Sequence, residues 1–229
     1  MKNRMFWLVA ALGVCGLAGW AISVPNQPVK NNRPELNEQK RFWVYEDSHL
    51  NLWKAANWMP QEATTMIKVF DPNCEENPKF GKRCIRVRIE KWTEPNWCGV
   101  AWAIPNPKDP AGGYWGEEPA PGWDLRGAKR VVFWARAPKP CRVQFKAAII
   151  GDKPYGDSAA SPAQTDWLSL TPEWKEYTID LKNVDLSRVI TGFCFVTNRD
   201  AQSERDAAVD FYLDQIYWDF GAKTEDLGK

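Results

Sequence analysis

The sequence predicts an all-β fold, an antiparallel β-sandwich of the jelly-roll type. Short segments that alternate apolar and polar residues recur along the chain, and they are rich in β-branched and aromatic side chains. Clusters of Pro, Gly, Asn and Asp separate these segments, and no segment has a long apolar pattern of helical period. Short strands at such intervals are typical of sandwiches and jelly rolls.

The clearest strand is IRVRI, in which Ile85, Val87 and Ile89 are expected to face inward and Arg86 and Arg88 outward. The remaining strand-like segments share its composition and its flanking turn residues. The first strand of the domain ends in the stretch FWVYEDSHLNLW, which starts at residue 42. The other predicted strands are 97–104, 130–137, 142–150, 175–181, 189–197 and 209–218.

The last predicted strand, 209–218, carries an acid that alternation does not explain. Strict alternation places Asp214 on one face with Tyr212, Ile216 and Trp218. A buried carboxylate without a partner is costly, so this acid is expected to have a structural or functional partner.

The first residues have the layout of a secretory signal, with basic residues before an apolar run over 6–24. Ala21 and Ser23 are small residues that suit cleavage after Ser23. Two alternatives stay open, because the run is long enough to remain as a membrane anchor and Cys15 lies in a lipobox-like LGVC. We predict an exported protein, secreted or in the cell envelope (extracellular or periplasmic), with a signal peptide or membrane anchor at 1–23.

The rest of the chain divides into a linker, one domain and a tail. Residues 24–40 are polar and predict a flexible linker, 41–220 form one jelly-roll domain without an internal repeat, and 221–229 form a polar tail. The 30 Lys and Arg balance 29 Asp and Glu, which gives no support for nucleic acid as a partner. Membrane contact is expected only through the N-terminal segment, and the oligomeric state does not follow from the sequence.

Five cysteines follow Cys15, and in an oxidising compartment cysteines are expected to pair. Cys74 and Cys84 flank the turn-rich stretch NPKFGK and are predicted to form a disulfide. The odd number leaves at least one thiol unpaired within the chain. The pairing stays open for Cys98, Cys141 and Cys194.

Several phrases, in this order, resemble galactose-binding-like jelly-roll domains, and most closely the carbohydrate-binding modules of secreted glycan-degrading systems. These phrases are GKRCIRVRI, WDLRGAKRVVFWARA, EWKEYTIDL and VDFYLDQIYW. The resemblance implies a polysaccharide or oligosaccharide ligand and places the first and last strands side by side. It also implies a structural calcium ion between them. Its predicted ligands are Glu46, Asp47, Asn77 and Asp214, because calcium requires several oxygen ligands.

The aromatic residues are the candidates for a sugar-binding surface. The chain has 14 Trp, and such rings either fill a core or serve as flat apolar platforms for a ligand. Trp115 is the principal predicted platform, because it follows Tyr114 within a long Pro- and Gly-rich loop, 105–122, where neither ring has an evident structural role. The further candidates are Trp97 in the strand before this loop and Trp53 and Trp58 in the loop after the first strand.

A noncatalytic carbohydrate-binding protein is favoured over an enzyme. His49 is the single histidine, which removes most arrangements with a histidine base. A pair of carboxylates, as in glycoside hydrolases, is the remaining catalytic possibility. A glycan-active hydrolase or lyase on the same scaffold therefore stays as the alternative, and a protein-binding surface domain is the third.

Overall fold

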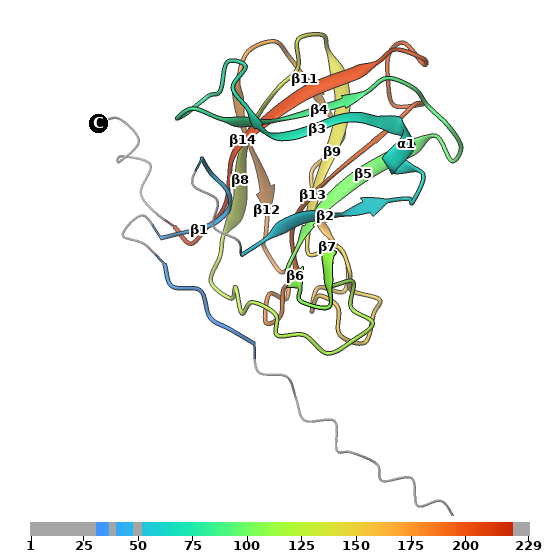
Figure 1. Ribbon diagram of the computed structural model, residues 1–229. Coiled ribbons are helices and arrows are strands. Elements are labelled where there is room, and N and C mark those ends of the chain that lie inside the picture. Colours follow the sequence, from blue (N-terminus) through green and yellow to red (C-terminus); the bar gives the residue numbers. More distant parts are fainter. Residues whose placement is uncertain (1–30, 37–39, 48–51, 222–229) are drawn as a thin grey trace, which may run out of the picture.

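The computed structural model describes residues 31–36, 40–47 and 52–221. The predicted signal or anchor, Cys15 and His49 lie outside these residues. Two six-stranded sheets, in which every strand pairing is antiparallel, form a β-sandwich, and the predicted all-β fold is confirmed (Figure 1). The described residues contain no helix that is long and apolar enough to cross a bilayer.

The first sheet has the order β12-β8-β14-β4-β3, and β1 also pairs with β14. The last strand therefore has β4 beside its first half and β1 beside its second half, so the first and last strands lie together as the resemblance implied. The strands are β1 (Arg41–Tyr45), β3 (Ile67–Cys74), β4 (Cys84–Ile89), β8 (Arg130–Arg136), β12 (Lys175–Asp180) and β14 (Val209–Asp219).

The second sheet has the order β10-β9-β13-β5-β2, and β11 also pairs with β9. A short hairpin of β6 and β7 follows β5, and the one-turn helix α1 (Ala63–Met66) joins β2 to β3. The strands are β2 (Lys54–Met59), β5 (Trp97–Ala103), β6 (Pro105–Asn106), β7 (Asp109–Gly113), β9 (Cys141–Ala147), β10 (Ala163–Gln164), β11 (Leu168–Leu170) and β13 (Thr191–Asn198).

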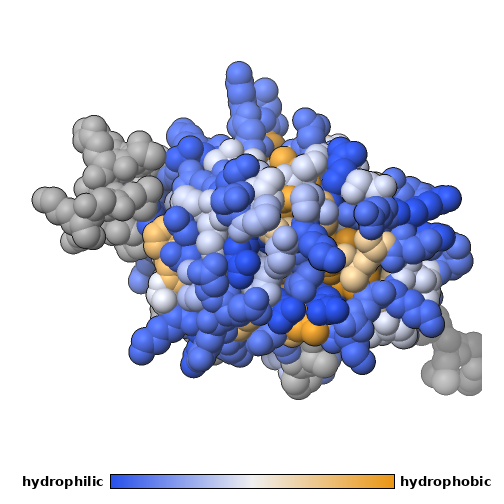
Figure 2. Space-filling model, turned by 90° about the horizontal axis from the view of Figure 1, so that it is seen from above, coloured by the Kyte–Doolittle hydropathy of each residue, from blue (hydrophilic) through white to orange (hydrophobic). Residues whose placement is uncertain are grey.

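The core lies between the two sheets and is largely aromatic. In β4 the predicted alternation is confirmed, because Ile85, Val87 and Ile89 are buried while the two arginines between them lie partly exposed. The rings of Phe133, Phe145 and Phe193 contact one another across the sandwich. On the face seen in Figure 2 the surface is mostly hydrophilic, with small separate apolar areas.

The alternation expected for the last strand is wrong beyond Asp214. A bulge between Asp214 and Tyr217 interrupts the pairing of β14 with β8, and Gln215 has a φ of 48°. The extra residue moves Ile216 and Trp218 onto the core face. Asp214 thus lies on the outer face of the first sheet, opposite Trp134 in the register.

Several segments differ from the sequence-based expectation, among them β3, β10 and β11, which were not predicted as strands. Residues 54–59, expected in a loop, form β2, because they pair with β5 at the edge of the second sheet. The loop 105–122 begins with the β6–β7 hairpin. Within the predicted linker, Asn32 donates its N–H to the Gly122 oxygen at 2.8 Å and accepts the Asp124 N–H at 2.6 Å, so this segment lies against the domain.

Candidate ligand-binding cleft

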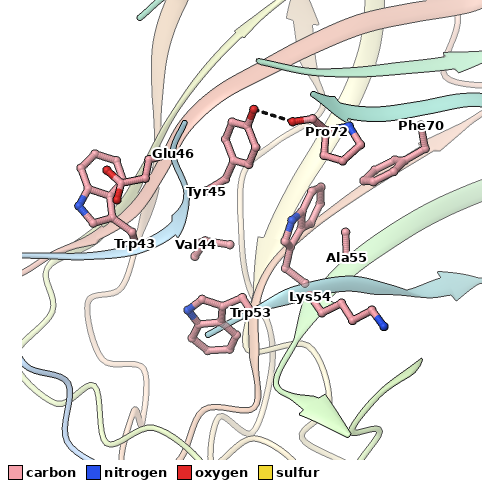
Figure 3. Close-up of a pocket in the computed structure, with 10 residues that line it drawn as sticks. Trp43, Val44, Tyr45, Glu46, Trp53, Lys54, Ala55, Phe70 and Pro72 are labelled. Atoms are coloured by element: carbon pink, nitrogen blue, oxygen red, sulfur yellow. Dashed lines mark hydrogen bonds between the residues drawn. The ribbon is translucent and has the colours of Figure 1, made fainter. Parts of the chain in front are cut away.

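An aromatic cavity, here called the inner cavity, lies where β1, β2 and β3 meet beside the core (Figure 3). Its volume is about 270 Å³. Half of the ten lining side chains are aromatic, and Glu46 and Lys54 add one charge of each sign. The full lining is Trp43, Val44, Tyr45, Glu46, Trp53, Lys54, Ala55, Phe70, Pro72 and Trp102.

A second cavity of about 670 Å³, here called the outer cavity, adjoins the first because Trp43 and Glu46 line both. Its other walls come from the segment 31–36, from β1, from Leu52 before β2 and from Trp123, and they are more strongly charged. They are Asn32, Arg33, Glu35, Arg41, Phe42, Leu52 and Trp123. The two cavities together are called the aromatic cleft below.

The first strand positions both walls through its alternation. Phe42 and Val44 point into the core, while Trp43 between them is partly exposed and packs on the Tyr217 ring with 4.9 Å between ring centroids. A register shift after Trp43 turns Tyr45 inward as well, and its hydroxyl donates to the Pro72 oxygen at 2.9 Å. Burial raises the pKa of Tyr45, so this hydroxyl stays protonated as a donor.

Trp53 forms the opposite side of the inner cavity from Tyr45 and Pro72 (Figure 3). The side chain is only 5% exposed, and Gly192 lies so close that an added Cβ would be 2.8 Å from the indole ring. Within the described part of the chain its buried Nε1–H has no hydrogen-bond partner, and the same holds for Nε1 of Trp123 in the outer cavity. A buried donor without an acceptor costs about 1–3 kcal/mol, so each indole would gain a hydrogen bond if a ligand oxygen reached its N–H.

The structure separates the five predicted sugar-binding residues. Trp53 lines the inner cavity, while Trp58 packs behind it, with its ring 5.4 Å from that of Phe70. Tyr114 follows β7, and its N–H donates to the oxygen of Ile104, just beyond β5, at 2.9 Å.

Trp97 and Trp115 are half-buried and lie outside the two cavities. Trp97 begins β5 on the outer face of the second sheet, because Cys98 and Trp102 point into the core. It is therefore about 20 Å along the strand from the end where Tyr114 is attached, at about 3.3 Å per residue. The predicted platforms do not form one site.

Sequence reasoning missed Trp43 and Tyr45 as site residues. Their signal was present in FWVY, where a large aromatic residue stands on the solvent-facing side of an alternating strand. The contributions of Phe70 and Trp102 depend on β3 and β5 coming beside β1 and β2, which no local pattern reports.

The predicted calcium ligands have different partners. Asp214 is fully buried, and its carboxylate accepts the N–H groups of Lys79 at 2.8 Å, Phe80 at 3.1 Å and Gln215 at 2.8 Å. Desolvation raises the pKa of Asp214 to about 6, although the hydrogen bonds from these three backbone N–H groups lower it. The groups around this carboxylate are hydrogen-bond donors, which suit an anion and not the oxygen ligands that a cation requires.

The other predicted ligands do not complete an oxygen shell. The Asp47 carboxylate accepts the N–H groups of Lys82 and Arg83, Glu46 lines the aromatic cleft, and the Asn77 oxygen accepts the Trp174 indole N–H. Among residues 31–36, 40–47 and 52–221, no group of three or more acidic, His or Cys side chains could hold a metal. These residues do not fit calcium, which takes 6–8 oxygen ligands. Calcium binding stays an untested prediction.

The predicted disulfide partners are adjacent but not bonded. Cys74 and Cys84 are directly opposite in the register of β3 and β4, and both are buried thiols in this structure. The Cys84 thiol lies 3.5 Å from the Cys74 carbonyl oxygen and donates to it. The expected pair is therefore brought together, while the disulfide itself is absent from the structure.

Comparison with known proteins finds structural similarity only. No protein-family model matches the chain, and no curated protein matches it in sequence. The fold is similar to that of carbohydrate-binding modules in solved structures. Three such modules come from Clostridium thermocellum.

The family 11 module of the cellulosomal cellulase Lic26A-Cel5E has a TM-score of 0.48 and 10% identity, covering 83% of this chain and 98% of that one. A family 11 module in complex with a β-1,3-1,4-mixed-linked tetrasaccharide has a TM-score of 0.45 and 12% identity, covering 80% and 96%. The family 30 module of the cellulase Cel9D-Cel44B has a TM-score of 0.45 and 13% identity, covering 76% and 94%. The similarity is one of sandwich architecture, and no residue role follows from it.

Proposed function

We propose that this protein is a noncatalytic carbohydrate-binding domain, and that it binds an oligosaccharide or polysaccharide in the aromatic cleft. The observation that carries the proposal is the combination of aromatic walls with unused indole donors. Trp43 offers a partly exposed ring, and Trp53 offers a buried N–H without a partner.

The chemistry of the cleft matches that of a sugar. A pyranose has apolar C–H faces that pack on aromatic rings, and hydroxyl groups that both donate and accept hydrogen bonds. Ligand sites generally combine a mostly apolar lining with a few placed polar groups. Here the rings supply the apolar lining, the Trp53 N–H is a donor, and the Glu46 carboxylate is an acceptor.

Isothermal titration calorimetry with soluble polysaccharides tests the proposal. The panel is mixed-linkage β-glucan, galactan, xylan and glucomannan, with wild type and Trp43→Ala. We expect at least one polysaccharide to bind and the substitution to weaken binding about tenfold or more. The apolar burial of such a side chain contributes about 1.5–3 kcal/mol, and tenfold corresponds to 1.4 kcal/mol. Trp167→Ala is the matched control, since this half-buried Trp lies between β10 and β11, at the opposite edge of the second sheet from β2.

Two further variants test separately whether the protein binds glycan and whether the aromatic cleft is the binding site. Trp97→Ala and Trp115→Ala remove the platforms that the sequence favoured. If these two abolish binding and Trp43→Ala does not, glycan binding stands and the cleft is the wrong site. If no polysaccharide of the panel, intact or partially hydrolysed, binds to wild type, the proposed function is refuted.

A glycan-cleaving enzyme is the second candidate, because two carboxylates, Glu35 and Glu46, line the outer cavity together. Glycoside hydrolysis uses a pair of carboxylates on either side of the bond. We expect wild type to release no reducing ends from the same polysaccharides. Release that is lost in Glu46→Gln would replace the binding proposal with an enzymatic one.

We also propose that the domain works outside the cytoplasm and that Cys74 and Cys84 are oxidised there. The layout of residues 1–23 supports export, and the direct pairing of the two cysteines across β3 and β4 supports the disulfide. Thiol–disulfide exchange with an oxidised dithiol would take two electrons and two protons from the pair. Peptide mapping without reductant, on protein recovered from the cell exterior or periplasm, should find the two peptides linked. Separate peptides would contradict the disulfide.

A further inference from the structure

We propose that the aromatic cleft recognises the end of a glycan chain, with one terminal sugar in the inner cavity and the adjoining units in the outer cavity. This inference rests on the proposed carbohydrate binding and names the part of the glycan that is bound. It follows from three properties of the inner cavity: its closed wall, its size and its buried donor.

The inner cavity is closed on one side by the hydrophobic core. Val44, Trp53 and Trp102 line it, all are at most 6% exposed, and all belong to the core between the sheets. The remaining lining residues are half-buried, apart from the buried Tyr45, and they form the mouth. A chain that points toward this wall cannot continue through the packed core, so in that direction only a chain end enters the cavity.

The two volumes suit one sugar followed by several. At about 270 Å³ the inner cavity is slightly smaller than ordinary ligand pockets, which have about 300–1,000 Å³, and it holds roughly nine waters at about 30 Å³ each. This space accepts a single pyranose ring. The outer cavity, at about 670 Å³, has room for further units. Trp43 lines both, so its ring lies where the first glycosidic bond would pass.

The unpartnered donor distinguishes an end from an internal unit. Figure 3 shows the nitrogen-bearing edge of Trp53 on the side of Val44 and Trp43. A terminal non-reducing sugar has a free hydroxyl at the position where an internal unit carries the next glycosidic bond. This additional hydroxyl can accept from the buried Trp53 N–H, which has no acceptor among the residues that the structure describes. An internal unit also has an oxygen at this position, but that oxygen carries the next sugar, for which the core wall beside Trp53 leaves no room.

Counting bound protein per gram of glycan tests the proposal. The probes are mixed-linkage β-glucan, galactan, xylan and glucomannan, each intact and each cut about tenfold shorter by partial acid hydrolysis, titrated into the full chain by calorimetry. We expect the binding capacity per gram to rise about tenfold with the number of ends, and borohydride reduction of the reducing ends to leave it unchanged. A capacity per gram that cutting leaves constant would show binding along the chain; the end-recognition proposal is then wrong, and carbohydrate binding stands. Absence of binding to all eight probes overturns both.

Trp53→Phe tests the donor separately, because it removes the N–H and keeps an aromatic ring. The expected loss of affinity for the shortened glycan is about 2- to 12-fold, the range of one hydrogen bond. Trp58→Phe is the matched control, since Trp58 packs behind Phe70 without lining either cavity. Melting temperatures of both variants report folding. Equal affinity of Trp53→Phe and wild type, with the fold intact, would exclude the indole as the group that reads the chain end.

Discussion

The buried carboxylate of Asp214 should make the stability of the domain depend on pH. It lies on the outer face of β14, without solvent exposure, and the hairpin amides of Lys79 and Phe80 cover one of its oxygens. Burial raises the pKa of this carboxyl from 3.8 to about 6. The folded state thus holds the proton more tightly than the unfolded chain does.

The sign and size of the effect follow from linkage. Because the folded pKa lies above the unfolded one, the contribution to stability is fully present below about pH 4 and is lost as the pH rises through about 6. A rise of about two pKa units corresponds to about 3 kcal/mol, at 1.36 kcal/mol per unit. The total free energy of unfolding of a domain is about 5–15 kcal/mol, so this term should be readily measured.

Urea unfolding of wild type and Asp214→Asn between pH 4 and pH 7 is the assay. The variant cannot ionise, so its stability relative to wild type should improve by about 2.4 kcal/mol as the pH rises over this range. Subtracting the two curves removes the contributions of the other titrating groups, which the variants share. A difference that stays constant within about 0.5 kcal/mol would refute the reasoning, because it would mean that the amides keep Asp214 ionised at the pKa of an exposed carboxyl.

Three further outcomes are expected. Chelation with EDTA should shift the melting temperature by less than about 2 °C, the smallest shift that a loss of 1 kcal/mol would give, because backbone amides surround the predicted calcium ligands; a larger fall would show that a metal is bound. Gly192→Ala should lose about 1–3 kcal/mol in urea unfolding and weaken glycan binding, because its Cβ would press on the Trp53 ring; unchanged binding and stability would contradict this packing. Asp157→Ala should lose more than about 3 kcal/mol, since it leaves three buried N–H groups, those of Ile150, Ile190 and Thr191, without their acceptor; a loss below about 1 kcal/mol would show that water replaces the carboxylate.

The strands could be predicted where one face of the sheet is buried. In β4 the apolar residues recur at every second position, and this period alone identifies the strand and its core face. In β14 the same reasoning failed after Asp214, because a bulge depends on how the strand pairs with β8 and leaves no mark in the apolar pattern. Residues 54–59 became a strand because β5 offers them a partner.

The site could be predicted only in part. The excess of Trp indicated rings that could bind a ligand, and Trp53 does line the inner cavity. The long loop singled out Trp115, which lies elsewhere. The resemblance correctly brought Asp47 near Asp214, whose pKa the Asp47 charge helps to raise. It could not show that the hairpin turns its N–H groups, rather than its carbonyl oxygens, toward Asp214.

By itself the sequence determined the class of fold and the chemical character of the protein, because a period of two and an abundance of Trp are properties of neighbouring residues and of composition. The tertiary structure decided which rings share a cleft, which indole N–H lacks an acceptor and which groups meet a buried acid. These depend on pairing between strands far apart in the chain, such as β1 with β14 and β2 with β5. The energy of such contacts exists only once the two sheets have packed against each other, so no local pattern contains it.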